Sequence, residues 1–375
     1  MTVEQSSWTP GSTAPPSAAD LVLAFGPRAL MASPEAFAAV QAQHPGAVVV
    51  GASTGGEIDG RAVTDGAVTT AAVTFRETGV ETAVCEIVPS EADDALGRRL
   101  AAALPAADRQ GRMLAHVIVL ADGVSLNGSA LVRGLEAALP AGVGLTGGLA
   151  GDGDRFAETP LWGATALSAP SVVAVGLYGS ALRVGVGAGT GWDRFGPERR
   201  VTRADGNVLY ELDGRSALDL YDEYLGPLAA EMPASGLRFP LGVRAAGQDY
   251  ELVRTLLAID RDAGSMTFAG DVPEGASARL MRSNPDRLVD GAIDGARAAA
   301  DVLGTAPELS LLVSCVGRRW TMGQRTEEEV EEAAAVLGGG AIVGFYSYGE
   351  LAPADGGSRC ELHNQTLTIT ALAEV

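Results

Sequence analysis

The chain has 375 residues and a formal net charge of −20 at pH 7, and 47% of its residues are hydrophobic but only 5% aromatic. Such an acidic chain argues against nucleic acid or an anionic membrane as its partner. All 27 basic residues are arginines, which excludes a pyridoxal-phosphate lysine and a phosphate-binding loop of the GxxxxGK[ST] type.

Cysteine usage and the N-terminus narrow the class of protein further. Cys85, Cys315 and Cys360 are widely spaced and include no CxxC pair, so spacing predicts neither a disulfide framework nor a structural zinc site. Residues 1–19 lack the basic start and apolar stretch of a secretory signal, and we expect a disordered leader. No apolar run approaches the roughly 20 residues that span a bilayer. We expect a soluble, cytoplasmic protein.

In the first half of the chain, the pattern predicts two α/β units joined by further strands. The first unit occupies residues 20–60, and the second ends near Asp154. A glycine-rich stretch at 185–192 marks the transition to the second half. The other elements expected in this half are strands over 67–75, 80–88, 162–167 and 172–177 and a helix over 93–104.

The second half opens with a strand over 208–212 and an amphipathic helix over 216–225. A hairpin is predicted over 250–269, where residues 260–264 supply the turn. A long helix over 285–303 then leads into a third α/β unit.

The three α/β units share one order of elements: strand, polar loop, helix, strand and glycine loop. A short buried strand that feeds a helix and returns to another strand is typical of mixed α/β sheets. We therefore predict a mixed α/β (α+β) fold of two similar lobes that arose by internal duplication, with mixed sheets packed together and helices outside. The first strands are 21–25, 116–120 and 309–315, and the helices lie around 34–41, 129–139 and 326–337.

Residues 344–353, which read GFYSYGELAP, place polar and aromatic groups beside glycines. The segment presents Tyr346, Tyr348 and Glu350. The two tyrosines alternate along an extended segment, so both are expected on one face, either to stack on a ligand ring or to pack between lobes. Glycine allows a ligand to approach the backbone closely, which favours a small-molecule pocket.

The strand over 362–372 opens with His363 and Asn364, which we place in the same pocket. The imidazole of His363 could contact a ligand, bind haem iron, or hold a loop by hydrogen bonds. A weaker echo of the first segment lies at residues 50–58, where Glu57 occupies the position of Glu350. The two glutamates could bind a ligand amine or act in acid-base chemistry, or each could stabilise its own turn.

Three further candidates stand at the ends of predicted strands. Arg318 could recognise a carboxylate or phosphate, or form a salt bridge with Glu350 or Asp355. Cys315 could be a nucleophilic or redox-sensitive thiol, or a small buried residue that closes the strand. Asp122 lies where α/β proteins bind ligands, although an aspartate before glycine also forms turns.

Two other glycine-rich patterns carry no site prediction. Residues 142–147 match GxGxxG, but they follow a helix and cross a strand, whereas a dinucleotide fingerprint has a strand before it and a helix after it. Asp152 and Asp154 lie in a glycine loop and are interpreted as part of a solvated turn.

These motifs, in this order, resemble the FIST family, whose members carry FIST N and FIST C domains in prokaryotic and eukaryotic signalling proteins. The resemblance covers about residues 20 to 372 and implies a FIST N-type domain over 20–205 and a FIST C-type domain over 206–375. The motifs that carry it are GASTGGEI (51–58), ADG (121–123), GGLAGD (147–152), GWD (191–193), VLYELDG (208–214), ALDLY (217–221), SCVGR (314–318), GFYSYGE (344–350) and HNQT (363–366).

The resemblance implies a sensory module for a small ligand, an amino acid or a related metabolite, that acts through a separate signalling protein. No cofactor is predicted. Alternatives remain: some bacterial relatives are haem-based nitric-oxide sensors, a role in which His363 would bind the iron, and eukaryotic relatives are substrate-binding parts of F-box proteins. A hydrolase that uses Cys315 and a protein-protein adaptor are also considered. No complete catalytic triad is recognisable in the sequence, which favours a binding function over a catalytic one.

Overall fold

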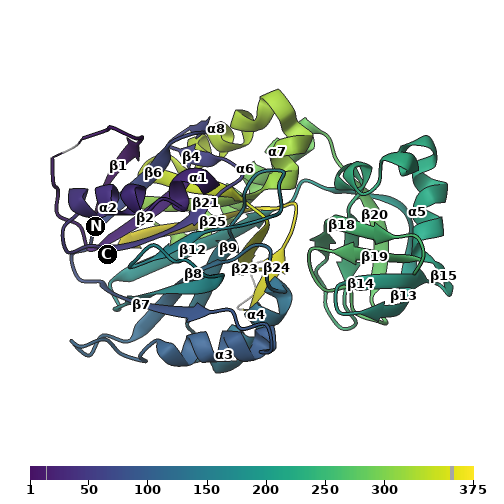
Figure 1. The fold of residues 1–375 in the computed structure, drawn as a ribbon, viewed down its shortest axis with the longest axis horizontal. Coiled ribbons are helices and arrows are strands. Elements are labelled where there is room, and N and C mark those ends of the chain that lie inside the picture. Colours follow the sequence, from purple (N-terminus) through teal and green to yellow (C-terminus); the bar gives the residue numbers. More distant parts are fainter. Residues whose placement is uncertain (14, 355–358) are drawn as a thin grey trace.

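The computed structural model describes residues 1–13, 15–354 and 359–375. A large body of three mixed sheets with helices on the outside lies beside a smaller, β-rich domain (Figure 1). The small domain, residues 193–282, is inserted between strand β12 (Leu182–Gly189) and helix α6 (Pro285–Leu303) of the large body. The predicted mixed α/β class, with packed sheets and outer helices, is confirmed.

The large body contains three copies of one α/β unit. In each copy, a first strand pairs in parallel with a second strand that follows the unit's helix, and a later strand pairs antiparallel with the first. In this order, unit 1 has β2 (Leu21–Gly26), α2 (Pro34–Gln43), β3 (Val48–Ser53) and β6 (Val68–Thr74). Unit 2 has β8 (Leu114–Ala121), α4 (Gly128–Ala138), β9 (Gly144–Leu149) and β11 (Ser171–Tyr178). Unit 3 has β21 (Leu309–Cys315), α8 (Thr326–Leu337), β22 (Ala341–Ser347) and β25 (Leu367–Glu374).

Each unit also contributes the segment after its second strand to the sheet of another unit. The hairpin β4 (Glu57–Asp59) and β5 (Ala62–Thr64) of unit 1 pairs with β22 of unit 3. The hairpin β23 (Gly349–Pro353) and β24 (Cys360–His363) of unit 3 pairs with β9 of unit 2. Strand β10 (Leu161–Gly163) of unit 2 pairs with β3 of unit 1. The three units therefore form a closed ring.

An edge strand completes each sheet: β1 (Thr2–Trp8), β7 (Gly79–Glu86) and β12 in units 1 to 3. The prediction of a disordered leader over residues 1–19 is wrong for β1, all seven residues of which pair with β6. The sequence of β1 is too polar to be recognised as a strand. Its stability comes from backbone hydrogen bonds to a neighbour whose register is fixed by the core.

The inner faces of the three sheets share one hydrophobic core. Phe25 of unit 1 stacks on Phe345 of unit 3, with ring centroids 4.6 Å apart, and Ile118 and Leu120 of unit 2 belong to the same cluster. The outer face of each sheet packs on helices, so the central strands are buried on both sides and read as nearly continuous apolar runs. The covering helices are α2 for unit 1, α3 (Asp93–Ala103) and α4 for unit 2, and α6 and α8 for unit 3.

The glycine-rich stretch at 185–192 has a packing role in unit 3. A Cβ atom added at Gly185, Gly187 or Gly189 of β12 would lie 1.7–2.1 Å from a backbone carbonyl oxygen of α6. These glycines therefore allow the helix to lie directly on the strand. Asn284 caps the start of helix α6, where its side chain accepts a hydrogen bond from the Arg287 amide at 3.0 Å, and left-handed Gly304 caps its end.

The small domain has its own hydrophobic core, formed by its sheet and helix α5 (Ala217–Leu225). Two 3₁₀ segments, Gly226–Glu231 and Ala234–Arg238, follow this helix. The strands are β13 (Asp193–Asp205), β14 (Val208–Leu212), β15 (Arg215–Ser216), β16 (Leu241–Arg244), β17 (Leu252–Arg254), β18 (Leu256–Asp260), β19 (Ser265–Phe268) and β20 (Ser277–Arg282).

Two short helices follow the first strands of units 1 and 3: α1 (Arg28–Met31) and α7 (Val316–Met322), the latter with a 3₁₀ turn at Gly323–Arg325. Both begin where loops of other units arrive, and they supply side chains to the site described below. In the part of the chain that the structure describes, no helix is both long enough and apolar enough to cross a membrane.

Candidate functional site: a charged pocket where the three units meet

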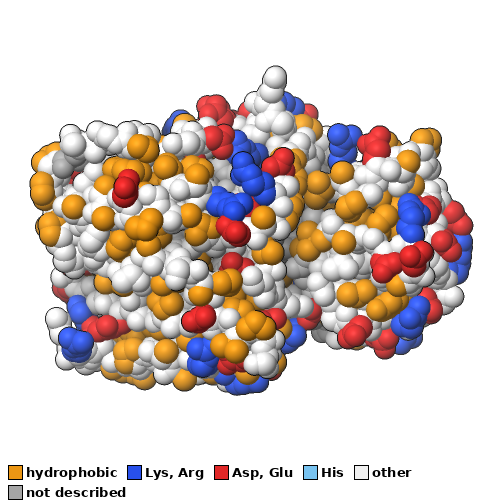
Figure 2. Space-filling view, viewed as in Figure 1, with side chains coloured by type: hydrophobic (Ala, Val, Ile, Leu, Met, Phe, Trp, Pro, Cys, Tyr) orange, Lys and Arg blue, Asp and Glu red, His pale blue; other side chains and the backbone are white. Residues whose placement is uncertain are grey.

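Loops of all three units converge at one end of the ring. The Gly55 amide donates to the Tyr346 carbonyl at 2.7 Å, the Gly151 amide to Ser53 at 2.8 Å, and the Tyr348 amide to Leu149 at 3.1 Å. A pocket of about 540 Å³ opens beside these contacts. Figure 2 shows basic and acidic side chains next to one another on this face, between the places of α1 and α7 in Figure 1. The lining residues are Pro27, Arg28, Thr54, Gly55, Gly56, Glu57, Asp65, Asp152, Gly153, Asp154, Arg155, Arg319, Trp320 and Gly323.

Arg319, from α7 of unit 3, reaches the loop of unit 1. Its guanidinium forms a bidentate pair with Asp65, at 2.9 and 2.6 Å, and donates to the Gly55 carbonyl. It also lies over the Tyr346 ring, 5.5 Å from the centroid. Gly56 allows this approach, because an added Cβ would lie 2.1 Å from Arg319 Nη1. The Arg319 side chain is 24% exposed and lines the pocket.

Glu57 is the buried acid of this pocket. Oε1 accepts a hydrogen bond from the Thr54 hydroxyl, while Oε2 is buried and has no partner among the described residues. Burial raises the pKa of Glu57 from 4.5 to about 8, although the Thr54 hydrogen bond opposes this shift. The side chain is therefore mostly neutral at pH 7. It can donate a hydrogen bond to a ligand, or give up its proton when a ligand favours the carboxylate.

Asp152 is the second buried acid, and it is ionised. Burial alone would raise its pKa, but hydrogen bonds from the Tyr348 hydroxyl and from the amides of Glu158 and Ala157 outweigh burial and lower it. Arg28 Nη1 lies 3.8 Å from Asp152 Oδ2. The interpretation of Asp152 as part of a solvated turn is wrong, because loops of two units enclose its carboxylate.

An aromatic wall flanks the acids. The ring of Phe156 stacks on Tyr348 at 4.4 Å between centroids and meets Trp320 edge-on at 6.1 Å. Phe156 has a positive φ of 49°, which is uncommon for a bulky residue and is characteristic of functional loops. Trp320 lines the pocket and is 38% exposed, so its ring is available to a ligand, whereas Phe156 is 43% exposed but packs against Trp320 outside the lining.

The predicted site residues Arg318 and Tyr346 do not face this pocket. Arg318 is fully buried and pairs with Glu329 of α8, with Nη2 2.7 Å from Oε2, and it also donates to the Leu288 carbonyl at 2.8 Å. Tyr346 donates to the other oxygen of Glu329 at 2.9 Å. The expected salt-bridge alternatives were Glu350 and Asp355. The observed partner is Glu329, and Asp355 lies outside the described residues.

Tyr346 and Tyr348 do not share a face, contrary to expectation. Tyr346 packs in the core between the third sheet and its helices, whereas Tyr348 packs in the core of unit 2. The reason is that the chain passes from one sheet to another between β22 and β23, so the two-residue alternation of a single strand does not extend across this point.

Glu350 and Cys315 lie together in the interior and do not line the pocket. Glu350 is fully buried and accepts hydrogen bonds from the Ser347 hydroxyl at 2.6 Å and the Thr366 amide at 3.3 Å. Burial raises its pKa to about 8 against these hydrogen bonds and one from Cys315. Burial likewise raises the pKa of the Cys315 thiol. A buried protonated thiol without a histidine partner is a poor nucleophile.

His363 and Asn364 lie where the small domain joins the large body. His363 Nε2 is 3.0 Å from the Ala352 carbonyl oxygen, and burial lowers the pKa of the imidazole to about 4. Asn364 donates to the His363 carbonyl at 2.9 Å, and its Oδ1 has no partner among the described residues. His363 lines neither the charged pocket nor the cavity described next, so this arrangement does not fit haem ligation.

Asp122 stabilises its own turn. Oδ1 accepts from the amides of Val124 and Ser125 at 3.0 and 2.6 Å, and Oδ2 accepts from the Thr159 hydroxyl at 2.7 Å. Asp122 therefore supports the loop that leads to Phe156 without lining the pocket.

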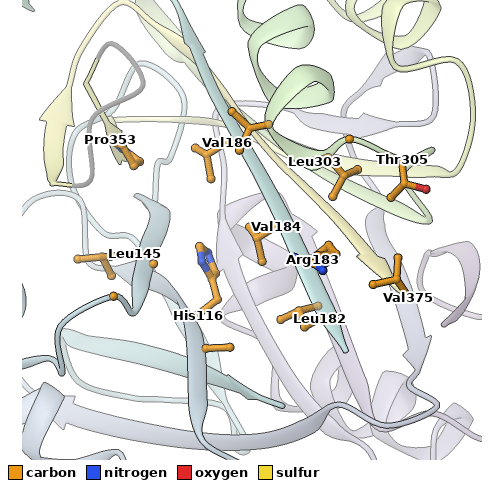
Figure 3. A pocket seen from close by; sticks show the side chains of 15 residues that line it. His116, Leu145, Leu182, Arg183, Val184, Val186, Leu303, Thr305, Pro353 and Val375 are labelled. Carbon is orange, nitrogen blue, oxygen red and sulfur yellow. The ribbon is translucent and has the colours of Figure 1, made fainter. Parts of the chain in front are cut away.

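A less polar cavity of about 630 Å³ lies between unit 2 and strand β12. Figure 3 shows His116 between Leu145 and Val184 in its wall. Burial lowers the pKa of His116 to about 4, and Nε2 lies 2.8 Å from the Thr146 hydroxyl. Mostly aliphatic and glycine residues line this cavity, so it lacks the paired charges of the first pocket.

Comparison with known proteins identifies the family. The profile of the FIST N domain matches residues 20–215, and that of the FIST C domain matches residues 217–353. The chain belongs to the FIST family. The FIST N match contains units 1 and 2, and the FIST C match contains most of the small domain and the start of unit 3 through β23. FIST domains are, as a class, sensory domains of signalling proteins.

The FIST chain is similar to uncharacterized mycobacterial proteins. Those of Mycobacterium tuberculosis strains CDC 1551 and H37Rv are 30% identical to it over 249 residues, which are 64% of this chain and 63% of each relative. One of Mycobacterium bovis is 29% identical over 275 residues, 71% of this chain and 69% of the relative. The match thus spans less than two thirds of the length of the M. tuberculosis relatives.

A solved chorismatase structure aligns with 99% of the FIST chain and 98% of its own chain, at 10% sequence identity and a TM-score of 0.35. A structural similarity this weak supports no conclusion about the fold or the activity of the FIST chain.

Proposed function

We propose that this FIST chain is a sensory module that binds an amino acid or a related zwitterionic metabolite in the charged pocket and passes its state to a separate signalling protein. The observation that carries the proposal is the pairing, within one open pocket, of partly exposed guanidinium groups with a buried, unsatisfied carboxyl oxygen. A zwitterion presents the complementary pair of charges.

Each end of such a ligand has a counterpart in the pocket. The carboxylate suits Arg28 and Arg319, whose side chains are 29% and 24% exposed. The ammonium group suits Glu57, because Oε2 accepts no hydrogen bond from a described residue. The ring of Trp320, which Phe156 supports from the side, suits an apolar side chain of the ligand. Because three units build the pocket, a ligand that contacts all of them would change the balance of contacts between them, which is one way to pass a signal.

The proposal is tested by calorimetric titration of the full chain with the twenty common L-amino acids. We expect at least one to bind saturably, and Arg319→Gln to weaken that binding by roughly tenfold or more, because a charge-assisted hydrogen bond is lost. Arg297→Gln is the matched control, since Arg297 is an exposed arginine of α6 that does not line the pocket. Wild-type protein that binds none of these ligands would refute an amino-acid sensor.

A further inference from the structure

A second charged cavity lies in the joint between the small domain and unit 2. Its volume is about 190 Å³. The small domain contributes strands β16 and β17 and the turn after β19, unit 2 contributes helix α4, and the remaining wall comes from residues at β24. The lining residues are Ser129, Arg133, Val243, Ala245, Gln248, Leu252, Arg254, Asp271, Pro273, Arg359 and Glu361.

Arg254 is the central group of this cavity, and no carboxylate of a described residue contacts its guanidinium. The residue is only 4% exposed. Nε donates to the Asp271 carbonyl at 2.9 Å, and Nη1 donates to the carbonyls of Val253 and Leu362 at 3.2 and 2.9 Å. All three acceptors are neutral. Among the described residues, none accepts a hydrogen bond from Nη2, and no carboxylate forms an ion pair with the guanidinium.

The two acids of the cavity lie near Arg254 but form their hydrogen bonds with other side chains. The Asp271 carboxylate holds Arg133 at 2.5 Å and the Asn127 amide at 2.8 Å, and Glu361 accepts from the Tyr250 hydroxyl at 2.9 Å. Arg133, Arg254 and Arg359 give three guanidinium groups against two carboxylates among the lining residues. The cavity is therefore positively charged, in a chain whose net charge is −20.

A buried cation with no carboxylate in contact is costly, and burial lowers the pKa of Arg254 to about 10, although the nearby charges of Asp271 and Glu361 oppose this shift. A small anion in the cavity would restore charge balance and would supply the acceptor that Nη2 lacks. We propose that this cavity binds a small oxyanion, a carboxylate or a phosphate, through Arg254 and Arg359, and that the bound anion fastens the small domain to unit 2. This site is separate from the charged pocket and does not depend on the proposed function.

The test is calorimetric titration of the full chain with inorganic phosphate and, separately, with malonate, at pH 7 and constant ionic strength. We expect saturable binding of at least one of them, and the one that binds identifies the ligand as a phosphate or a carboxylate. Arg254→Gln is expected to weaken binding by roughly tenfold or more. Arg359→Gln is expected to weaken it without affecting folding, because that residue is exposed. Arg297→Gln is again the control.

Hydrogen exchange tests the fastening of the small domain. The amides of β17 are expected to exchange more slowly in the presence of the anion that binds. Lack of saturable binding of both anions, or binding that is unchanged in Arg359→Gln and in folded Arg254→Gln, would overturn the site. If Arg254→Gln does not fold, the anion binding measured for Arg359→Gln is by itself the test of the site. Binding that leaves exchange at β17 unchanged would overturn the fastening role.

Discussion

Ser347 donates a hydrogen bond to Glu350 at 2.6 Å, and in the equivalent loop of unit 1 Thr54 donates to Glu57 in the same way. In each case the hydroxyl residue comes three positions before the acid. Burial raises the pKa of both carboxyl groups to about 8. Glu57 lines the charged pocket, whereas Glu350 is fully buried and does not line it, so the same local structure occurs once at an open pocket and once in the interior.

The shared pKa shift predicts a pH-dependent stability. Because both folded-state pKa values lie above the ordinary 4.5, the folded chain binds more protons than the unfolded chain between these values. The stabilising contribution is fully present below about pH 4.5 and is lost as the pH rises through about 8. Glu350→Gln stays neutral at every pH, so it should flatten the slope of unfolding free energy against pH by up to about 1.4 kcal/mol per pH unit.

Urea unfolding of wild type and variant at matched pH values between 5 and 8.5 measures this difference. His116 and His363, whose pKa values are lowered to about 4, destabilise the fold as the pH falls below about 6.5, and they do so equally in both proteins. Parallel curves for the two proteins would contradict the assignment of a neutral Glu350.

Ligand binding should release a proton. An ammonium group beside Glu57 favours the ionised carboxylate and lowers its pKa from about 8, so a proton leaves at pH 7. Titrations in Hepes and in Tris should therefore give apparent enthalpies that differ in proportion to the ionisation enthalpies of the buffers. Glu57→Gln should remove that difference. Equal enthalpies in both buffers for the wild type would exclude Glu57 as the partner of the amine.

Arg318 is predicted to matter for stability and not for recognition. Arg318→Met leaves Glu329 buried without its cation, which should cost about 3–5 kcal/mol of unfolding free energy. The double variant Arg318→Met, Glu329→Leu should recover only part of this loss, because the buried hydroxyls of Ser314 and Tyr346 would lose the carboxylate that accepts their hydrogen bonds. Chemical denaturation measures both effects. A folded Arg318→Met protein with unchanged stability and weakened ligand binding would instead support the recognition role expected from the sequence.

Gly187→Ala should destabilise the large body. The added Cβ would lie 2.0 Å from the Gly295 carbonyl oxygen, so α6 must move away from β12, and overpacking of this kind costs about 1–3 kcal/mol. Gly339→Ala provides the matched control, because no atom lies within 4 Å of its added Cβ and its φ is not positive. Thermal melting of the two variants compares them directly, and equal melting temperatures would argue against the close contact.

The cysteines should react slowly in the folded protein. All three are buried, and burial raises the pKa of each thiol. Ellman's reagent is expected to modify them only on unfolding. Rapid modification of Cys315 in the folded chain, tested with Cys315→Ser as the reference, would revive a nucleophilic role for it.

The sequence predicts well those elements whose signals are local. Helix α6 has a capping asparagine, a proline at its first position and a glycine at its end, and its observed bounds match the predicted 285–303. The three βαβ units likewise follow from buried strands alternating with helices. The separate small domain does not stand out, because its hairpins resemble those that continue a sheet.

Most of the pocket could not be predicted, because its parts come from different units. Arg28 follows the first strand of unit 1 and Arg319 that of unit 3, and only the closed ring places them together. The partner of Arg318 was missed because Glu329 lies in the acidic first turn of α8, where acids are favoured by the helix dipole alone. Glu57 was considered because its loop repeats the motif around Glu350, but the sequence left open whether it binds a ligand or only stabilises its own turn.

The closed ring also constrains how the chain is made. Strand β4 leaves the ribosome early, yet its partner β22 is among the last strands to be synthesised. Strand β9 likewise has no partner on that side until β23 has been synthesised. Until then the nascent N-terminal half carries unpaired strand edges that can bind other chains. Truncation near the boundary between the two family matches would make those edges permanent. In this protein the profile boundary is therefore a poor place to cut, and the whole chain is the smallest unit in which every sheet is complete.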